Sequence, residues 1–168
     1  MEFYFSEDKW FMRKDEQTDE KFALGLHIPK FYSKIIDVDD CKLQSEISNG
    51  ILNFTREFFK SRGTSIYSTD THTGYLRFLV IRQSRNTSDL MVNLITSEYD
   101  DKTVRAYAKE LLTDFPSITT IVNSTTERKA QVAFSEKEYV MHGEGYIYEI
   151  LSNNGRQYKF KISPNSFF

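Results

Sequence analysis

Residues 75–82 read Tyr-Leu-Arg-Phe-Leu-Val-Ile-Arg, and residues 90–96 read Leu-Met-Val-Asn-Leu-Ile-Thr. Apolar side chains dominate both stretches, as is typical of strands that are buried on both faces. A short polar connection, residues 83–89, separates them. We therefore expect the two stretches to pair as a β-hairpin with both faces buried.

Strand patterns continue outward from this hairpin in both directions. Further strands are expected at residues 2–11, 22–28, 35–38, 117–123, 145–151 and 156–162. The last two flank Asn153-Asn154-Gly155, a strong hairpin turn because Asn-Gly tolerates positive φ at both central positions. Residues 13–21 are charged and lack an apolar period, which indicates a loop.

Two segments have the period of an amphipathic helix. In the first, 45–62, apolar residues recur at spacings of four and three, Ser45 is a plausible N-cap, and Gly63 stands where a C′ glycine is expected. The second spans about 101–115 and stops at Pro116. Strands that outnumber helices and are joined by hairpins predict an α+β fold, a largely antiparallel sheet with both helices packed on one face.

The composition restricts the class of protein. The 168 residues carry 22 basic and 24 acidic side chains, a net charge of −2, which argues against a stand-alone nucleic-acid binder but not against a local basic patch. No run of 18 apolar residues is present, so no membrane span is expected. A single cysteine fits a reducing compartment, and we expect the protein in the cytoplasm.

No self-contained catalytic set is visible. The three histidines (His27, His72, His142) are far apart and lack metal-ligand spacing, and there is no glycine-rich phosphate loop or Gly-x-Ser-x-Gly elbow. Cys41 follows two aspartates at a strand end. It is either a small buried hydrophobe or one ligand of a metal site that cysteines elsewhere complete.

Arginines on the central strand are the second candidates. Arg77 and Arg82 have opposite parity, so in a regular strand they face opposite sides. Each is either an ordinary strand arginine or a phosphate contact. Arg56 and its basic neighbours lie near the end of the first helix, where cations oppose the helix dipole, which is explanation enough for them.

Both ends of the sequence resemble cuts. The chain enters a strand pattern at once and stops at Phe167-Phe168, two large apolar side chains. They are either core for a further domain or a stacking platform for an unstacked base. We therefore expect a module from a larger protein.

Taken together, four stretches resemble the RNA uracil-5-methyltransferases. They are Met1–Ser6; Phe22–His27 with Ile35–Cys41, similar to a "G-x-H … I-V-D-x-x-x-C" passage; His72–Arg82, similar to "H-x-G-x-L-R … R"; and Ile162–Phe168, similar to "S-P-x-x-F". Order and spacing match across nearly the whole chain.

The resemblance implies that residues 1–168 are the single central domain of such an enzyme, without its TRAM domain and its S-adenosylmethionine-binding catalytic domain. In the parent, Cys41 matches the last ligand of a 4Fe-4S cluster, which implies 23S ribosomal RNA rather than transfer RNA as the substrate. Phe167 matches an aromatic residue beside the target uridine, and His72, Arg77 and Arg82 are candidate RNA contacts. The implied chemistry is attack of a cysteine thiolate on C6 of a flipped uridine and methylation at C5.

The resemblance also implies what this chain does not do by itself. It is expected to be catalytically inactive and to hold no cofactor; its partners are RNA and the remaining domains of the same polypeptide. The alternative, which the net charge of −2 favours, is a non-catalytic α+β interaction or binding module.

Overall fold

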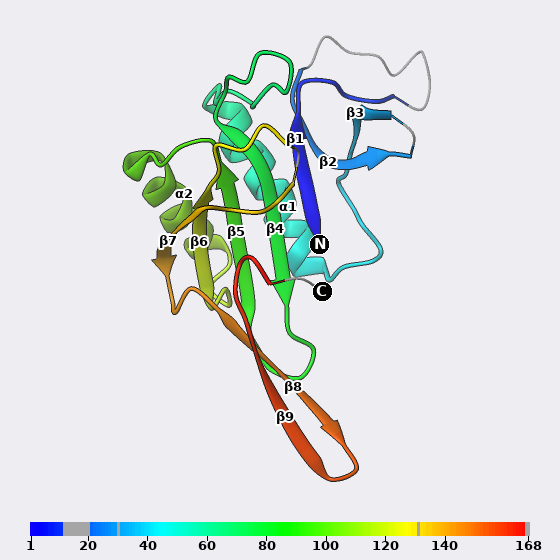
Figure 1. Cartoon of the computed structure of the whole chain (residues 1–168), viewed down its shortest axis with the longest axis vertical. Coiled ribbons are helices and arrows are strands. Elements are labelled where there is room, and N and C mark those ends of the chain that lie inside the picture. The colour runs from blue at the N-terminus through cyan, green and yellow to red at the C-terminus, as the bar shows by residue number, and fades with distance from the viewer. Residues whose placement is uncertain (12–20, 30, 131, 167–168) are drawn as a thin grey trace.

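A computed structural model describes residues 1–11, 21–29, 31–130 and 132–166 (Figure 1). A seven-stranded sheet has the order β3-β2-β1-β4-β5-β6-β7, and β8 and β9 form a separate hairpin. The strands are β1 (Glu2–Ser6), β2 (Ala23–Ile28), β3 (Phe31–Asp37), β4 (Leu76–Gln83), β5 (Leu90–Thr96), β6 (Thr120–Thr125), β7 (Lys137–His142), β8 (Ile147–Asn153) and β9 (Arg156–Ile162). The helices are α1 (Glu46–Ser61) and α2 (Asp101–Asp114).

The hairpin predicted from residues 75–96 forms the middle of the sheet. β4 and β5 pair antiparallel, and all but the last two residues of β4 and every residue of β5 are buried. β1 pairs with β4 on the other side, with Phe3 opposite Leu79. Only β5 and β6 pair in parallel within the described sheet, and α2 supplies the crossover that a parallel pair requires. The predicted α+β fold is confirmed.

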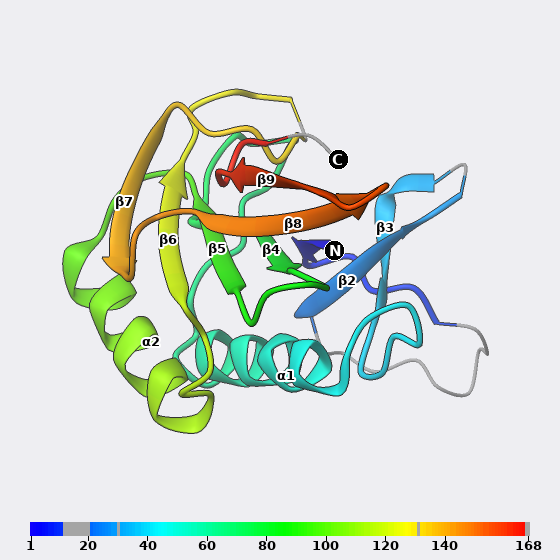
Figure 2. The ribbon, with the colours of Figure 1, turned by 90° about the horizontal axis from the view of Figure 1, so that it is seen from below.

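Both helices cover the same face of the sheet, and the β8–β9 hairpin lies on the other face (Figure 2). Ser45 caps α1 as predicted, since its hydroxyl accepts a hydrogen bond from Ser48 N at 3.3 Å. The core between helices and sheet contains a fully buried tyrosine, Tyr107, whose hydroxyl lies 2.7 Å from Thr55 Oγ1. The packing of both helices on one face therefore agrees with the prediction.

Several boundaries differ from the predicted ones. β1 ends at Ser6 rather than near residue 11, because the chain then leaves its pairing with β2, and Lys9 bridges to Ile35 of β3 instead. β6 starts at Thr120, three residues later than predicted. β7 was not predicted, since it is a charged, largely exposed edge strand with no apolar run. The predicted loop 13–21 lies, apart from Lys21, outside the described residues.

The predicted Asn-Gly turn joins β8 to β9. Asn154 and Gly155 have φ of 50° and 75°, the two positive values that this turn requires. At the base of the hairpin, Ile147 and Ile162 pack with Met91 of β5. The rest of the hairpin extends past the end of the sheet (Figure 1). No helix among the described residues is long and apolar enough to cross a membrane.

Candidate functional site

Arg82 lies near the end of β4 and holds the last described residues of the chain. Its Nη2 donates to the carbonyl oxygens of Pro164 at 3.1 Å and Ser166 at 2.6 Å. Burial of the guanidinium lowers the pKa of Arg82. Since the strand is rigid and central, Arg82 fixes where the Ser163–Ser166 turn sits on the sheet.

The same turn is held from a second direction by Asn165. Its Oδ1 accepts hydrogen bonds from the amide and the hydroxyl of Ser135, both at 3.0 Å. Its Nδ2 donates to Ser135 O at 3.2 Å and to Glu138 Oε1 at 2.9 Å. Within the turn, Ser166 Oγ accepts from Ser163 N at 2.9 Å. The "S-P-x-x-F" segment is therefore a fixed structure as far as Ser166, while Phe167 lies outside the described residues.

A cavity of about 420 Å³ adjoins this turn. Its walls come from β1, the end of β4, the base of the β8–β9 hairpin and the turn itself, with Glu2, Arg82, Ile147, Ile162 and Ser166 among the lining residues. Small-molecule sites usually measure roughly 300–1,000 Å³. The cavity is thus lined by apolar side chains and by the Arg82 guanidinium, which is bonded to the carbonyl oxygens of the turn.

Arg77 has a different place. Only 4% of it is exposed, and its guanidinium donates to the carbonyl oxygens of Thr126 (3.0 Å), Arg128 (2.7 Å) and Ala130 (3.0 Å). The parity argument does not apply to it, because β4 has a register shift between Leu76 and Phe78. In this structure Arg77 fixes the segment that leads from β6 toward β7.

His72 lies close to Arg77, through Tyr67. The guanidinium of Arg77 stacks 4.0 Å from the centre of the Tyr67 ring, and Tyr67 Oη lies 3.3 Å from His72 Nδ1. His72 is exposed and has φ of 56°, a conformation that few non-glycine residues adopt. His72 and Arg77 thus belong together at the start of β4, roughly 17 Å along the strand from Arg82.

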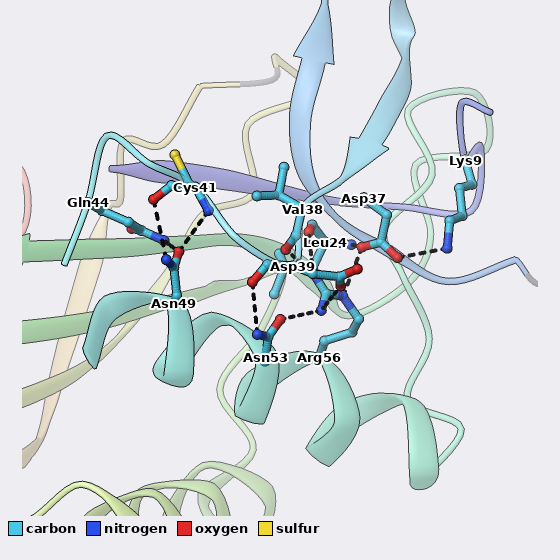
Figure 3. Close-up of polar contacts among 10 residues, drawn as sticks. All are labelled: Lys9, Leu24, Asp37, Val38, Asp39, Cys41, Gln44, Asn49, Asn53 and Arg56. Atoms are coloured by element: carbon cyan, nitrogen blue, oxygen red, sulfur yellow. Dashed lines mark hydrogen bonds and ion pairs between the residues drawn. The ribbon is translucent and has the colours of Figure 1, made fainter. Parts of the chain in front are cut away.

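Cys41 is buried in the turn between β3 and α1 (Figure 3). Asn49 of α1 fixes the turn: its Oδ1 accepts from Cys41 N at 3.0 Å, and its Nδ2 donates to Cys41 O at 3.3 Å. Gln44 Nε2 also donates to Asn49 Oδ1, at 2.6 Å. Among the residues that the structure describes, no group of three or more His, Cys, Asp or Glu side chains is placed to hold a metal.

Arg56 is the residue whose role the sequence did not reveal. It is buried and donates to Asp37 Oδ1 (2.8 Å), Asp39 Oδ1 (3.0 Å), Asn53 Oδ1 (2.6 Å) and the carbonyl oxygens of Leu24 and Val38 (Figure 3). The dipole explanation was therefore insufficient. A signal was present, since Arg56 stands four residues after Leu52 and three before Phe59, on the buried side of α1.

Proteins described as RNA methyltransferases match this chain over nearly its full length. No known family profile matches it. Three relatives are described as uncharacterised RNA methyltransferases. The protein from Chlorobaculum tepidum is 38% identical over all of this chain and 35% of its own length. Those from Oceanobacillus iheyensis and Bacteroides thetaiotaomicron are 31% and 30% identical, over 90% and all of this chain and over 32% and 37% of their own lengths. The chain thus spans about a third of the length of the curated relatives it matches.

A solved structure has the same fold. The Pyrococcus abyssi tRNA (uracil-54, C5)-methyltransferase, in complex with S-adenosyl-L-homocysteine, superposes with a TM-score of 0.66 and 23% identity over 99% of this chain and 36% of that one. The resemblance to RNA methyltransferases that the sequence indicated is thus confirmed over the full length of this chain, and the chain has the fold of the matching third of the Pyrococcus abyssi enzyme.

Proposed function

We propose that this chain is the central, RNA-contacting domain of an S-adenosylmethionine-dependent RNA uridine-C5 methyltransferase. The observation that carries the proposal is the Ser163–Ser166 turn, which Arg82 and Asn165 hold beside a cavity in a chain matched over its full length by RNA methyltransferases. The catalytic chemistry belongs to the remaining two thirds of such an enzyme, so the chain by itself is inactive in this proposal.

The residues of this chain have binding and positioning roles in that scheme. A base-modifying enzyme must take its base out of the stack. Arg82 sets the turn that leads to Phe167, and Phe167 stacks on the unstacked uridine. His72 is exposed and is a direct RNA contact. Arg77 is buried against carbonyl groups, so its contribution to RNA binding is to shape the 126–130 segment. S-adenosylmethionine, when bound elsewhere in the enzyme, supplies the methyl group.

We further propose ribosomal RNA as the substrate and Cys41 as one ligand of a 4Fe-4S cluster in the longer protein. The turn around Cys41 is fixed by Asn49, as suits a ligand that must not move. Cys41 is the single cysteine of the sequence, and the described residues contain no group of three or more His, Cys, Asp or Glu side chains placed to hold a metal. In this proposal three further cysteine ligands therefore come from elsewhere in that protein. The relative of known structure acts on transfer RNA by its description, which makes transfer RNA the competing substrate.

The experiment that tests the function uses the native gene product that contains this chain, prepared without oxygen. Iron content is measured together with methyl transfer from S-adenosylmethionine to ribosomal- and transfer-RNA fragments, with 5-methyluridine as the product. We expect the native protein to methylate ribosomal RNA and to contain iron. We expect the iron to be lost in Cys41→Ser. Methylation of transfer RNA by a protein without iron would overturn both the proposal of a ribosomal-RNA substrate and the proposal of a 4Fe-4S cluster. No methylation of either RNA returns the chain to the alternative of a binding module.

Replacement of Arg82 by methionine tests the positioning role. Hydrogen bonds from a charged group contribute about 1.5–3 kcal/mol each. We expect the rate of methyl transfer by the native protein to fall about 10- to 100-fold, which is the loss of one such hydrogen bond from the stabilisation of the transition state. In the isolated chain, the amide of Ser166, which bonds to Ser163 O, should exchange faster with solvent. Unchanged activity together with faster exchange would limit Arg82 to a structural role.

A further inference from the structure

The β8–β9 hairpin extends from the body of the protein but starts at the candidate site. Ile147, Glu149 and Ile162, at its base, line the cavity beside Arg82. Glu149 also accepts hydrogen bonds from the backbone amides of Arg85 at 2.8 Å and Asn86 at 3.1 Å. Hydrogen bonds to its carboxylate, above all the one from the Arg85 amide, lower the pKa of Glu149 to about 2. The base of the hairpin is thus anchored, and from Leu151 to Lys161 every residue is exposed.

The strand register separates the hairpin into two faces. Tyr148 lies opposite Lys161 and Ile150 opposite Lys159, so these four residues share one face. On it Lys159 Nζ lies 3.7 Å from the centre of the Tyr148 ring, and Lys161 Nζ lies 3.7 Å from the centre of the Tyr146 ring. We call Tyr146, Tyr148, Lys159 and Lys161 the lysine–tyrosine face.

The charge of the hairpin differs in sign from that of the whole chain. Residues 146–162 contain Arg156, Lys159 and Lys161 but only one acid, Glu149, which is engaged by backbone amides, whereas the full chain has a net charge of −2. Among the described residues, neither lysine of the face forms an ion pair with a carboxylate. The projecting arm is therefore a local cationic patch on a slightly acidic protein.

We propose that the lysine–tyrosine face binds the phosphate backbone of the RNA, on the side of the hairpin opposite to the one that lines the cavity. The proposal rests on the proposed function and names the surface that this function uses. Lys159 and Lys161 are two residues apart on β9, about 7 Å along the strand, so each ammonium contacts its own phosphate of one RNA strand. Tyr146 and Tyr148, whose rings lie beside those ammonium groups, offer flat surfaces on which an unpaired base stacks.

The charge complementarity favours RNA over a protein partner for this face. The other face of the arm carries Leu151, Tyr158 and Phe160, each about half exposed, and has the composition of a protein contact. The two faces can be tested separately, because their side chains alternate along β9.

The experiment measures binding of a fluorescent, uridine-loop RNA stem-loop to the 168-residue chain across a series of salt concentrations. The variant is K159Q/K161Q, and the matched control is K102Q/K109Q, which removes two exposed lysines of α2 on the opposite side of the sheet. Loss of two phosphate contacts lowers the salt slope by about 1.4 and weakens binding roughly 10- to 30-fold at 0.1 M salt. K159R/K161R should retain affinity, and the control should bind as the wild type does.

Equal RNA affinity and salt slope in K159Q/K161Q and wild type would overturn the proposal. If the native longer protein still methylated RNA, the proposed function would stand without this arm. If the wild-type chain did not bind RNA, the proposal for the lysine–tyrosine face would also be overturned. The methylation assay with the native protein would then decide whether the proposed function fails as well. An unaffected lysine variant, with self-association of the chain lost in Y158S/F160S, would identify the arm as a protein contact instead.

Discussion

Replacement of Arg56 by methionine should lower the free energy of unfolding by about 3–5 kcal/mol, because it removes the buried guanidinium from the Asp37 carboxylate. Among the described residues, the remaining partners of Asp37 are then Lys9 Nζ at 2.9 Å and the amide of Leu24 at 3.0 Å. The carbonyl oxygen of Leu24 and that of Val38 also lose a buried donor. Urea unfolding monitored by tryptophan fluorescence and circular dichroism measures the change.

Two comparisons make this expectation specific. Glu57→Ala, one residue further along α1 but exposed, should change stability by no more than about 0.5 kcal/mol. The double variant Arg56→Met/Asp37→Asn should lose less than the sum of the single variants, because the uncompensated charge is then gone. Additive losses in the double variant would show that the ion pair is not what holds α1 to β2 and β3.

Replacement of Gly25 by alanine should destabilise the chain by about 3 kcal/mol or more, the upper end of the cost of overpacking. A Cβ at this position would stand 1.8 Å from the carbonyl oxygen of Ile36 and 2.9 Å from its carbonyl carbon. Backbone of the paired strand cannot yield as a flexible side chain can. The β2–β3 pairing should open, and the Asp37–Cys41 turn that follows β3 should lose its protection against hydrogen exchange.

Gly63 provides the matched control for Gly25. It has φ of 59°, but a Cβ there would meet nothing within 4 Å. Gly63→Ala therefore carries only the conformational cost of a left-handed residue, about 1–2 kcal/mol. If the two alanine variants were equally stable, the close approach of β2 to β3 at Gly25 would not be a constraint on the fold.

The parts of the fold that the sequence predicted are those with a local cause. The buried β4–β5 pair follows from continuous apolar runs, the cap of α1 from Ser45, and the β8–β9 turn from Asn154-Gly155. β7 escaped prediction because an exposed edge strand needs no apolar pattern, only a partner strand to pair with. The pairing of β7 with β6 cannot be predicted from the residues of β7 alone.

The same distinction separates the candidate site residues. Arg77 and Arg82 looked alike in sequence, yet the first is buried against three carbonyl groups and the second holds the Ser163–Ser166 turn beside a cavity. This difference has two causes: the register shift in β4, and the distant segments that supply the acceptors, 126–130 for Arg77 and 163–166 for Arg82. Arg56 likewise donates to acceptors that are distant in sequence, in β2, at the end of β3 and in the turn after β3.

The pairing of β1 with β4 has a consequence for the rate of folding. Phe3 meets Leu79, so β2, β3 and α1 are all contained in the loop that this contact closes. Closing a long loop costs chain entropy before any contact compensates it, and proteins dominated by distant pairings fold slowly. The β4–β5 hairpin is local and can form early. We expect the pairing of β1 with β4, which closes the long loop, to form later, and until then β4 presents an unpaired edge.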